Sequence, residues 1–387
     1  MEPKIRFKGF EGEWRNLSIT EIASLKAGKS FNKHDAIDKP TVGYYPCYGG
    51  NGQRGYLPYY NQEGKYNIIG RQGALCGCIN VAEGKFYATE HAVIVTPINV
   101  SDFEFLHESL IRANINQYAT GAAQPGISVT NVNSQLTLNY PIYEEQKALG
   151  KYFTSLDSQI SASTSRLASL KQMKAASLQA MFPQEGETVP KMRFKGFEGE
   201  WTWLKLGDIS EQVKRKAPIN STAPVMMISA LNGFINQSEK YSDNNAGSSL
   251  ANYTLLKKGE LSYNHGYSKT RNFGSCFNLL VEEARIPFVY HSFRLTNDND
   301  SFYAYYLNSG TKDKDLKRLV SSTARMDGLL NISFKNYMEL SVPHPSLAEQ
   351  QAIASYFTSL DRQISLQSQR LEKLKQIKSA CLDKMFV

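Results

Sequence analysis

The sequence predicts an α+β protein with an internal pseudo-twofold repeat, in which two mixed α/β regions alternate with two long helices. Two observations lead to this prediction. Near-identical segments occur twice within 387 residues, and the longer of them has the apolar spacing of a helix. The stretches between these segments differ from each other and carry short β-rich runs. We call the repeated segments the framework and the stretches between them the first and second cassettes.

The framework consists of two pairs of matching segments. Residues 4–14 (KIRFKGFEGEW) match residues 191–201 (KMRFKGFEGEW) at ten of eleven positions. Residues 145–182 match residues 349–386 at 22 of 38 positions. The first pair is offset by 187 residues and the second by 204, so the second cassette is 17 residues longer. With only two copies of a very long period, a solenoid is not expected.

The cassettes retain only weak echoes of each other. Arg71-Gln72-Gly73 corresponds to Asn264-His265-Gly266, and His91 corresponds to His291. Near-identical framework therefore surrounds two divergent cassettes.

The longer framework segments are expected to be helices. Neither contains Gly or Pro beyond its first turns, and Pro183 follows the first. The apolar side chains of each segment form a long stripe, or seam, that needs a partner. We therefore expect the two copies to pair as an antiparallel coiled coil, in which Ser163 and Gln367 interrupt the apolar seams. The alternative is two separate amphipathic helices, each on its own domain. The apolar positions are Leu156, Ile160, Leu167, Leu170, Leu178 and Met181, and then Leu360, Ile364, Leu371, Leu374, Ile377 and Met385.

The cassettes are expected to be mixed α/β domains. Short helices are expected at residues 103–114 and 301–308. Short β-rich runs between Gly- and Asn-rich turns predict strands at residues 66–70, 92–96, 135–139, 225–229, 260–263 and 292–295.

The composition favours a cytoplasmic protein with an acidic partner. Lys and Arg number 44 against 36 Asp and Glu, a net charge of +8 that suits nucleic acid or serves solubility alone. Five irregularly spaced cysteines argue for reduced thiols. The N-terminal residues lack the apolar segment of a secretory signal, and no run is long enough for a membrane helix.

No sequence motif for catalysis is found. Gly28-Lys29-Ser30 lacks the earlier glycine of a phosphate-binding loop, and Cys76-x-Cys78 has no second pair for zinc. His91 and His291 lie in apolar runs, which favours structural histidines over ligands. We therefore expect no catalytic residues and no metal site in this chain.

With catalysis set aside, the remaining interpretation is recognition of DNA through polar residues in glycine-rich loops. Arg can donate two hydrogen bonds to guanine, and Asn or Gln can pair with adenine, in the major groove. The alternative is that these are ordinary polar loops. Lys171, Lys174, Lys375 and Lys378 are expected on solvated helix faces. The candidate DNA-binding residues are Tyr48, Asn51, Gln53, Arg54, Arg71, Gln72 and Gln124, and then Asn264, His265, Lys269, Arg271 and Arg325.

These features together resemble the specificity subunit of type I restriction–modification systems. The resemblance rests on the Arg-Phe-Lys-Gly-Phe-Glu-Gly-Glu-Trp openings at 6–14 and 193–201. It rests also on the Pro…Glu-Gln…Phe…Leu-Asp…Ile segments at 141–160 and 345–364. It covers essentially the whole chain. The first of these latter segments departs slightly, because a second proline commonly precedes Glu-Gln there.

The resemblance implies that the cassettes are target recognition domains, each reading half of a bipartite DNA site, and that the paired helices are a spacer. Two modification (methyltransferase) subunits and the restriction (translocase and nuclease) subunits would be partners. They would hold S-adenosylmethionine, ATP and Mg²⁺, and this chain would hold no cofactor. A catalytic DNA methyltransferase or nuclease chain, or a protein-only adaptor, are the alternatives. The expected limits are 1–143 and 191–344 for the recognition domains, 144–183 and 345–387 for the spacer helices, and 184–190 for a linker.

Overall fold

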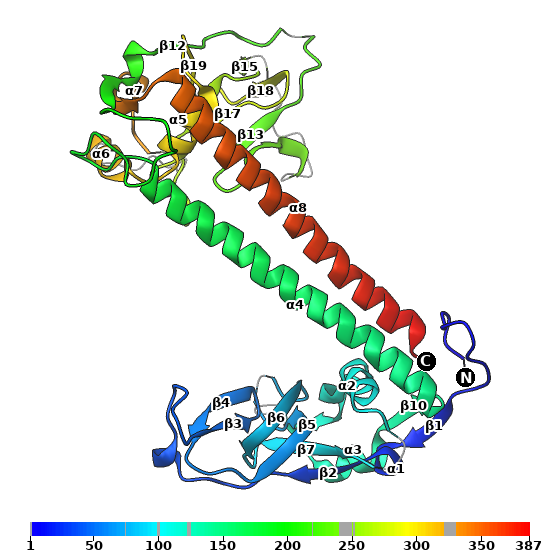
Figure 1. The fold of residues 1–387 in the computed structure, drawn as a ribbon. Helices are drawn as coiled ribbons and strands as arrows, with labels where there is room; N and C mark the ends of the chain where they lie inside the picture. Colours follow the sequence, from blue (N-terminus) through cyan, green and yellow to red (C-terminus); the bar gives the residue numbers. More distant parts are fainter. Residues whose placement is uncertain are drawn as a thin grey trace. The chain divides into compact units, whose positions relative to one another are not determined.

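The computed structural model describes residues 2–73, 75–98, 101–121, 125–218, 220–239, 250, 252–320 and 330–387. The chain divides into two compact units. The first unit comprises Met1–Ser165 with Gln369–Val387, and the second comprises Arg166–Ser368. The two expected long helices are confirmed as α4 (Tyr143–Ala180) and α8 (Leu347–Met385). Each unit therefore contains the beginning of one long helix and the end of the other (Figure 1).

The elements of the first cassette precede α4. They are β1 (Arg15–Ser18), α1 (Ile19–Ile22), β2 (Ala23–Ala27), η1 (Lys33–Asp35), β3 (Tyr45–Gly49), β4 (Gly52–Leu57), β5 (Gln62–Gly70), β6 (Ile79–Ala88), β7 (Ala92–Pro97), α2 (Phe103–Arg112), η2 (Ile115–Tyr118), β8 (Ala119–Thr120), β9 (Gly126–Ile127), α3 (Val129–Gln135) and β10 (Thr137–Tyr140).

The elements of the second cassette precede α8. They are β11 (Thr202–Lys205), η3 (Leu206–Asp208), β12 (Ser210–Gln212), β13 (Met226–Ser229), β14 (Gly233–Asn236), η4 (Gln237–Glu239), β15 (Thr254–Lys257), β16 (Leu261–Asn264), β17 (Ser275–Asn278), β18 (Glu283–Ile286), β19 (His291–Leu295), α5 (Asp300–Leu307), α6 (Asp313–Leu319), α7 (Phe334–Met338) and β20 (Ser341–His344).

The two cassettes share a four-stranded antiparallel kernel. The order β2-β7-β5-β6 in the first unit matches β12-β19-β16-β17 in the second. The first sheet is extended by β3 and β4, whereas the second cassette adds the separate ribbons β13–β14 and β15–β18. Five of the six predicted strands and both short helices lie where the sequence places them. The run at 135–139 is displaced, because Gln135 ends α3 and the strand begins at Thr137.

The same framework joint holds each unit together. In the first unit Arg6 donates from Nε and Nη2 to the carboxylate of Glu145, at 2.7 and 2.6 Å, and also to the carbonyls of Gly12 and Glu11. Glu145 is only 2% exposed. A buried charge pair is stable when its remaining donors and acceptors are satisfied, as they are here. The repeated opening sequence thus fixes the chain to the start of α4.

The joint of the second unit repeats these bonds. Arg193 donates from Nε and Nη2 to Glu349, both at 2.7 Å, and to the carbonyls of Gly199 and Glu198. The repeated framework sequence therefore has one structural explanation: it forms the same arginine–glutamate pair in each unit.

Aromatic side chains surround each joint. In the first unit Phe105 of α2 stacks on Phe386 at the end of α8, with ring centroids 5.2 Å apart, and Trp14 packs edge-on against both. In the second unit Phe302 of α5 packs on Phe182, which follows α4, and on Trp201. Large buried aromatic rings contribute most of the packing energy of a small core. Each core therefore joins a cassette, its framework opening and both long helices.

Within each unit the two helix segments run antiparallel. In the first unit Tyr152 contacts Cys381 and Asp157 contacts Lys378, so residue numbers increase along α4 as they decrease along α8. In the second unit Ser177 meets Tyr356 in the same sense.

The expectation for two of the four helix lysines was wrong. Lys378 donates to Asp157 and Glu108, and Lys174 donates to Asp361, so both lie in ion pairs rather than on solvated faces. They sit at equivalent framework positions, 204 residues apart, where cassette and helices converge. Lys171 and Lys375 are exposed as expected, but Ile377, assigned to the apolar seam, is 36% exposed.

We predict that Arg6→Ala destabilises the protein by about 3 kcal/mol, because it leaves the buried carboxylate of Glu145 without its charged partner. Arg193→Ala should have a similar effect, since it loses the same set of bonds. Lys8→Ala, an exposed change in the same opening segment, is the control. Chemical denaturation of the full chain measures all three. Equal midpoints for Arg6→Ala and Lys8→Ala would contradict the importance of the joint.

Candidate nucleic-acid interface

The first candidate segment is a hairpin and not the expected loop. Residues 45–57 form β3 and β4, and only Gly50 and Asn51 make the turn. Asn51, Gln53 and Arg54 are exposed there. Tyr48 is different: it is half-buried, packs edge-on against Phe86, and has its pKa raised by burial. The hairpin therefore presents three polar side chains, while the ring of Tyr48 belongs to the sheet core.

Close backbone contacts bring the hairpin tip beside Gln72. A Cβ added to Gly50 would lie 2.4 Å from the carbonyl oxygen of Gln72, and one added to Gly70 would lie 2.0 Å from the carbonyl oxygen of Gly50. Only glycine permits such an approach. Gln72 itself is exposed and its backbone bridges to Gly126. Four predicted residues therefore gather at one end of the first sheet: Asn51, Gln53, Arg54 and Gln72.

Arg71 adjoins this cluster but faces inward. It is half-buried, and its guanidinium donates from Nε to the carbonyl of Ile127 at 3.1 Å and from Nη1 to the carbonyl of Glu90 at 3.4 Å. While it makes these bonds, Arg71 supports the backbone and does not extend toward a base edge.

The second candidate segment follows β16. Tyr267, which is 63% exposed, and Lys269 project from it. Asn264 is half-buried and bonds the carbonyl of Ile228 and the amide of Gly266. Arg271 is also half-buried. Tyr267 and Lys269 are thus among the exposed side chains of this loop, with Thr270 and Asn272.

Burial lowers the pKa of Arg271, and the nearby Asp313 opposes that shift. An arginine remains charged even so, because its ordinary pKa lies far above neutrality. Arg271 therefore retains its positive charge in the loop after β16.

The structure places His265, a predicted DNA-binding residue, in the interior of the second unit. The side chain is 4% exposed, and both ring nitrogens face carbonyl oxygens, those of Leu330 at 2.6 Å and Val289 at 3.0 Å. Its ring also stacks on His291, with centroids 4.8 Å apart. A glycine-rich polar context therefore concealed a buried structural residue.

The two remaining candidates, Gln124 and Arg325, lie outside the described residues. Sequence reasoning also overlooked Asn80, whose amide lies against the hairpin, 3.1 Å from a Cβ added to Gly52. Only the pairing of β5 with β6 brings Asn80 there, and no local sequence signal indicates it.

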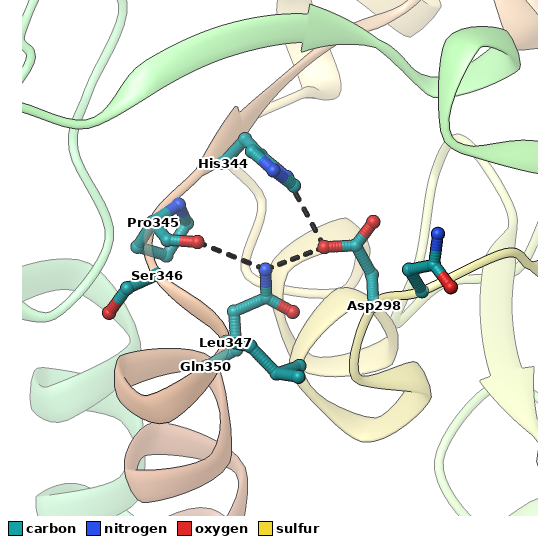
Figure 2. Close-up of a pocket in the computed structure, with 7 residues that line it drawn as sticks. Asp298, His344, Pro345, Ser346, Leu347 and Gln350 are labelled. Carbon is teal, nitrogen blue, oxygen red and sulfur yellow. Dashed lines mark hydrogen bonds and ion pairs between the residues drawn. The ribbon is translucent and has the colours of Figure 1, made fainter.

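A pocket of about 260 Å³ lies at the start of α8, away from these loops (Figure 2). His344 Nδ1 lies 3.2 Å from Asp298 Oδ1, which also accepts a hydrogen bond from Gln350. The corresponding place in the first unit has a different pair, Ser101 and Tyr140, whose hydroxyls lie 3.0 Å apart. The pocket thus belongs to the framework joint, at a point where the two joints differ.

Among the described residues, no helix combines the length and apolar character needed to cross a bilayer. In that same part of the chain, no three His, Cys, Asp or Glu side chains are grouped to hold a metal ion.

Comparisons with known proteins agree with the repeated architecture. The family model for the type I restriction modification DNA specificity domain matches twice, at residues 11–172 and 198–376. The specificity subunit of the type I restriction enzyme EcoprrI of Escherichia coli is 40% identical over 143 residues. That match spans 37% of this chain and only 35% of the relative.

Among solved structures, the fold is similar to that of the S subunit of a type I restriction-modification system from M. genitalium. The TM-score is 0.68 at 16% identity, over 100% of this chain and 99% of that one. The HsdS subunit from Thermoanaerobacter tengcongensis aligns with a TM-score of 0.43 at 15% identity, over 98% of both chains.

Proposed function

The chain belongs to the family of type I restriction-modification specificity subunits, and from this premise we propose that it reads a bipartite, asymmetric DNA sequence. One observation carries the proposal. The arginines of the Arg6–Glu145 and Arg193–Glu349 joints make the same four hydrogen bonds, yet the joints hold cassettes that differ beyond a shared kernel. Matching joints suit a partner that binds twice, and different cassettes suit two different half-sites.

The partners would be two modification subunits, one at each joint, and the restriction subunits. Catalysis would belong to them. They would supply S-adenosylmethionine for adenine methylation, and ATP and Mg²⁺ for translocation and cleavage. In this chain we assign a recognition role alone, without catalytic residues.

We propose that the antiparallel helix contacts within each unit belong to one continuous coiled coil that serves as the spacer between two recognition domains. The supporting fact is that α4 and α8 are uninterrupted helices of 38 and 39 residues. The domain limits follow the framework: residues 1–143 and 191–344 for recognition, 144–183 and 345–387 for the spacer, and 184–190 for the linker.

The exposed polar residues are the proposed readers. Asn51, Gln53, Arg54 and Gln72 of the first unit are exposed and close together, with the donors and acceptors that base edges require. In the second unit Lys269 is the exposed cation, and Tyr267 beside it offers an aromatic ring and a hydroxyl. Arg271 would contribute positive charge near the phosphates.

Replacing residues 15–140 with the cassette of another specificity subunit should change one half-site and leave the other intact. The boundaries suit the exchange, because β1 and β10 pair with each other and would move together. Methylome sequencing of cells with the original and the exchanged gene measures both halves of the modified sequence. A change in both halves, or in neither, would count against modular recognition.

Arg54→Ala and Gln72→Ala should each relax one position of the site and cost about 1–3 kcal/mol of binding to the cognate duplex. Lys171→Ala, on an exposed helix face, is the matched control and should at most weaken all sequences alike. Binding to the cognate duplex and to every single-base variant, at two salt concentrations, distinguishes these effects. Uniform losses for both cassette variants would place the readers elsewhere.

Inserting one heptad into α4 and one into α8 should lengthen the unread gap by about three base pairs. Seven residues add about 10 Å at roughly 1.5 Å each, and a base pair occupies about 3.4 Å. The methylated motif reports the gap directly. An unchanged gap would exclude a spacer role for the helices.

A further inference from the structure

Two different side chains occupy equivalent supporting positions in the two cassettes. Strand registers place both side chains just beyond the same point of the shared kernel: Gly70 of β5 pairs with Ala92 of β7, and Tyr263 of β16 pairs with His291 of β19. These are the last paired residues of matching strands. Arg71 follows immediately after Gly70 and so corresponds in register to Asn264, whereas His265 lies one residue farther along. The likeness of Arg71 and His265 is therefore in their contacts. By this register, the counterpart of His291 is Ala92, one residue beyond His91.

In the first unit Arg71 connects two backbone segments. One acceptor is the carbonyl of Glu90, two residues before Ala92. The other is the carbonyl of Ile127 in β9. The backbone of Ile127 returns the contact, because its amide donates to the carbonyl of Arg71 at 2.8 Å. Arg71 therefore closes a two-way link between the end of β5 and the segment that leads to α3.

In the second unit His265 makes a similar set of contacts. One acceptor is the carbonyl of Val289, two residues before His291. The other is the carbonyl of Leu330, whose own amide donates to the carbonyl of His265 at 2.8 Å. The segment that begins at Leu330 leads to α7, as the segment at Ile127 leads to α3. Three connections of Arg71 thus have a counterpart at His265, and Arg71 also donates from its amide to the carbonyl of His91.

The two side chains differ in how they can supply two donors. A guanidinium always carries enough N–H groups, but a neutral imidazole carries only one. Because carbonyl oxygens only accept hydrogen bonds, Arg71 can serve both of its carbonyls at once, whereas a neutral imidazole at His265 would donate to one of its two.

The ring of His265 is also held by its neighbours. His291 on β19 stacks on it with ring centroids 4.8 Å apart, and its own Nε2 donates to the carbonyl of Ile332. The ring of Tyr263 on β16 lies 6.1 Å from that of His265.

We propose that Arg71 and His265 are equivalent positioning residues, which hold the reading loops of the first and second cassettes by bridging the same two backbone segments. The inference rests on the proposed function. Arg71 fixes the backbone of Gln72, and His265 fixes the start of the loop that carries Tyr267 and Lys269. Loss of either side chain should therefore weaken the reading of its own half-site and leave the other half-site unchanged.

The test is selection of sequences from a randomised duplex library by the full chain with its modification subunits. We expect Arg71→Ala to reduce discrimination at the first half-site by about fivefold for each hydrogen bond lost, and to leave the second half-site constant. Arg71→Lys should partly restore discrimination at the first half-site.

Two variants extend the test to the second unit. His265→Leu removes both side-chain donors and should reduce discrimination at the second half-site alone. His291→Gln keeps an N–H for the carbonyl of Ile332 and should leave both half-sites unchanged. Equal losses at both half-sites for Arg71→Ala, or no loss at either, would overturn the positioning role even if His265→Leu failed to fold. Failure of the wild-type chain to enrich any sequence would overturn the proposed function itself.

Discussion

A buried arginine–glutamate pair at each framework joint is the interaction on which the rest of this structure depends. Removing two charges from water costs several kcal/mol for each ion, and a single contact rarely offsets that cost. Arg6 offsets it by combining a bidentate pair with two carbonyl bonds, and Arg193 repeats the arrangement. The demanding geometry explains why the opening segment is nearly invariant between the copies. Gly9 and Gly12 have φ of 99° and 85°, which other residues rarely adopt, so replacing either would strain the backbone whose carbonyls complete the arginine's hydrogen bonds.

With the joints fixed, the cassettes are free to differ where no framework residue contacts them. Both keep the kernel β2-β7-β5-β6 or β12-β19-β16-β17, because it carries the apolar face against the framework aromatics. Additions occur beyond it, as the β3–β4 hairpin in one unit and as the β13–β14 and β15–β18 ribbons in the other. An antiparallel kernel tolerates such additions, since a new hairpin needs only a free edge or a turn. The candidate readers lie in these additions and in kernel loops.

The sequence was sufficient for the repeat, both long helices and most predicted strands, because identity, helical period and β-rich runs are local signals. It was insufficient wherever contacts depend on register. The segment at residues 44–56 looked like a loop because its glycines signal turns, yet they allow the tight packing of Gly50 against Gln72. His265 looked exposed from its polar surroundings in the sequence. Its side chain is in fact buried and lies within hydrogen-bond distance of two carbonyl oxygens that are distant in the chain. Lys378 looked solvated, since its partner Glu108 is 270 residues away.

The surface where cassette meets framework shows which cassette residues can vary. Phe105 and Phe302 occupy equivalent places in α2 and α5, and both pack on framework aromatics, so an aromatic ring is required there. Three residues later the cassettes differ: Glu108 accepts a hydrogen bond from Lys378, whereas Tyr305 donates to Asp361. Either choice works because the framework itself supplies a Lys–Asp pair at both joints. On the apolar part of this surface, the cassette therefore has to supply an aromatic ring. On the polar part, it only has to add a hydrogen bond to a Lys–Asp pair whose charges already balance.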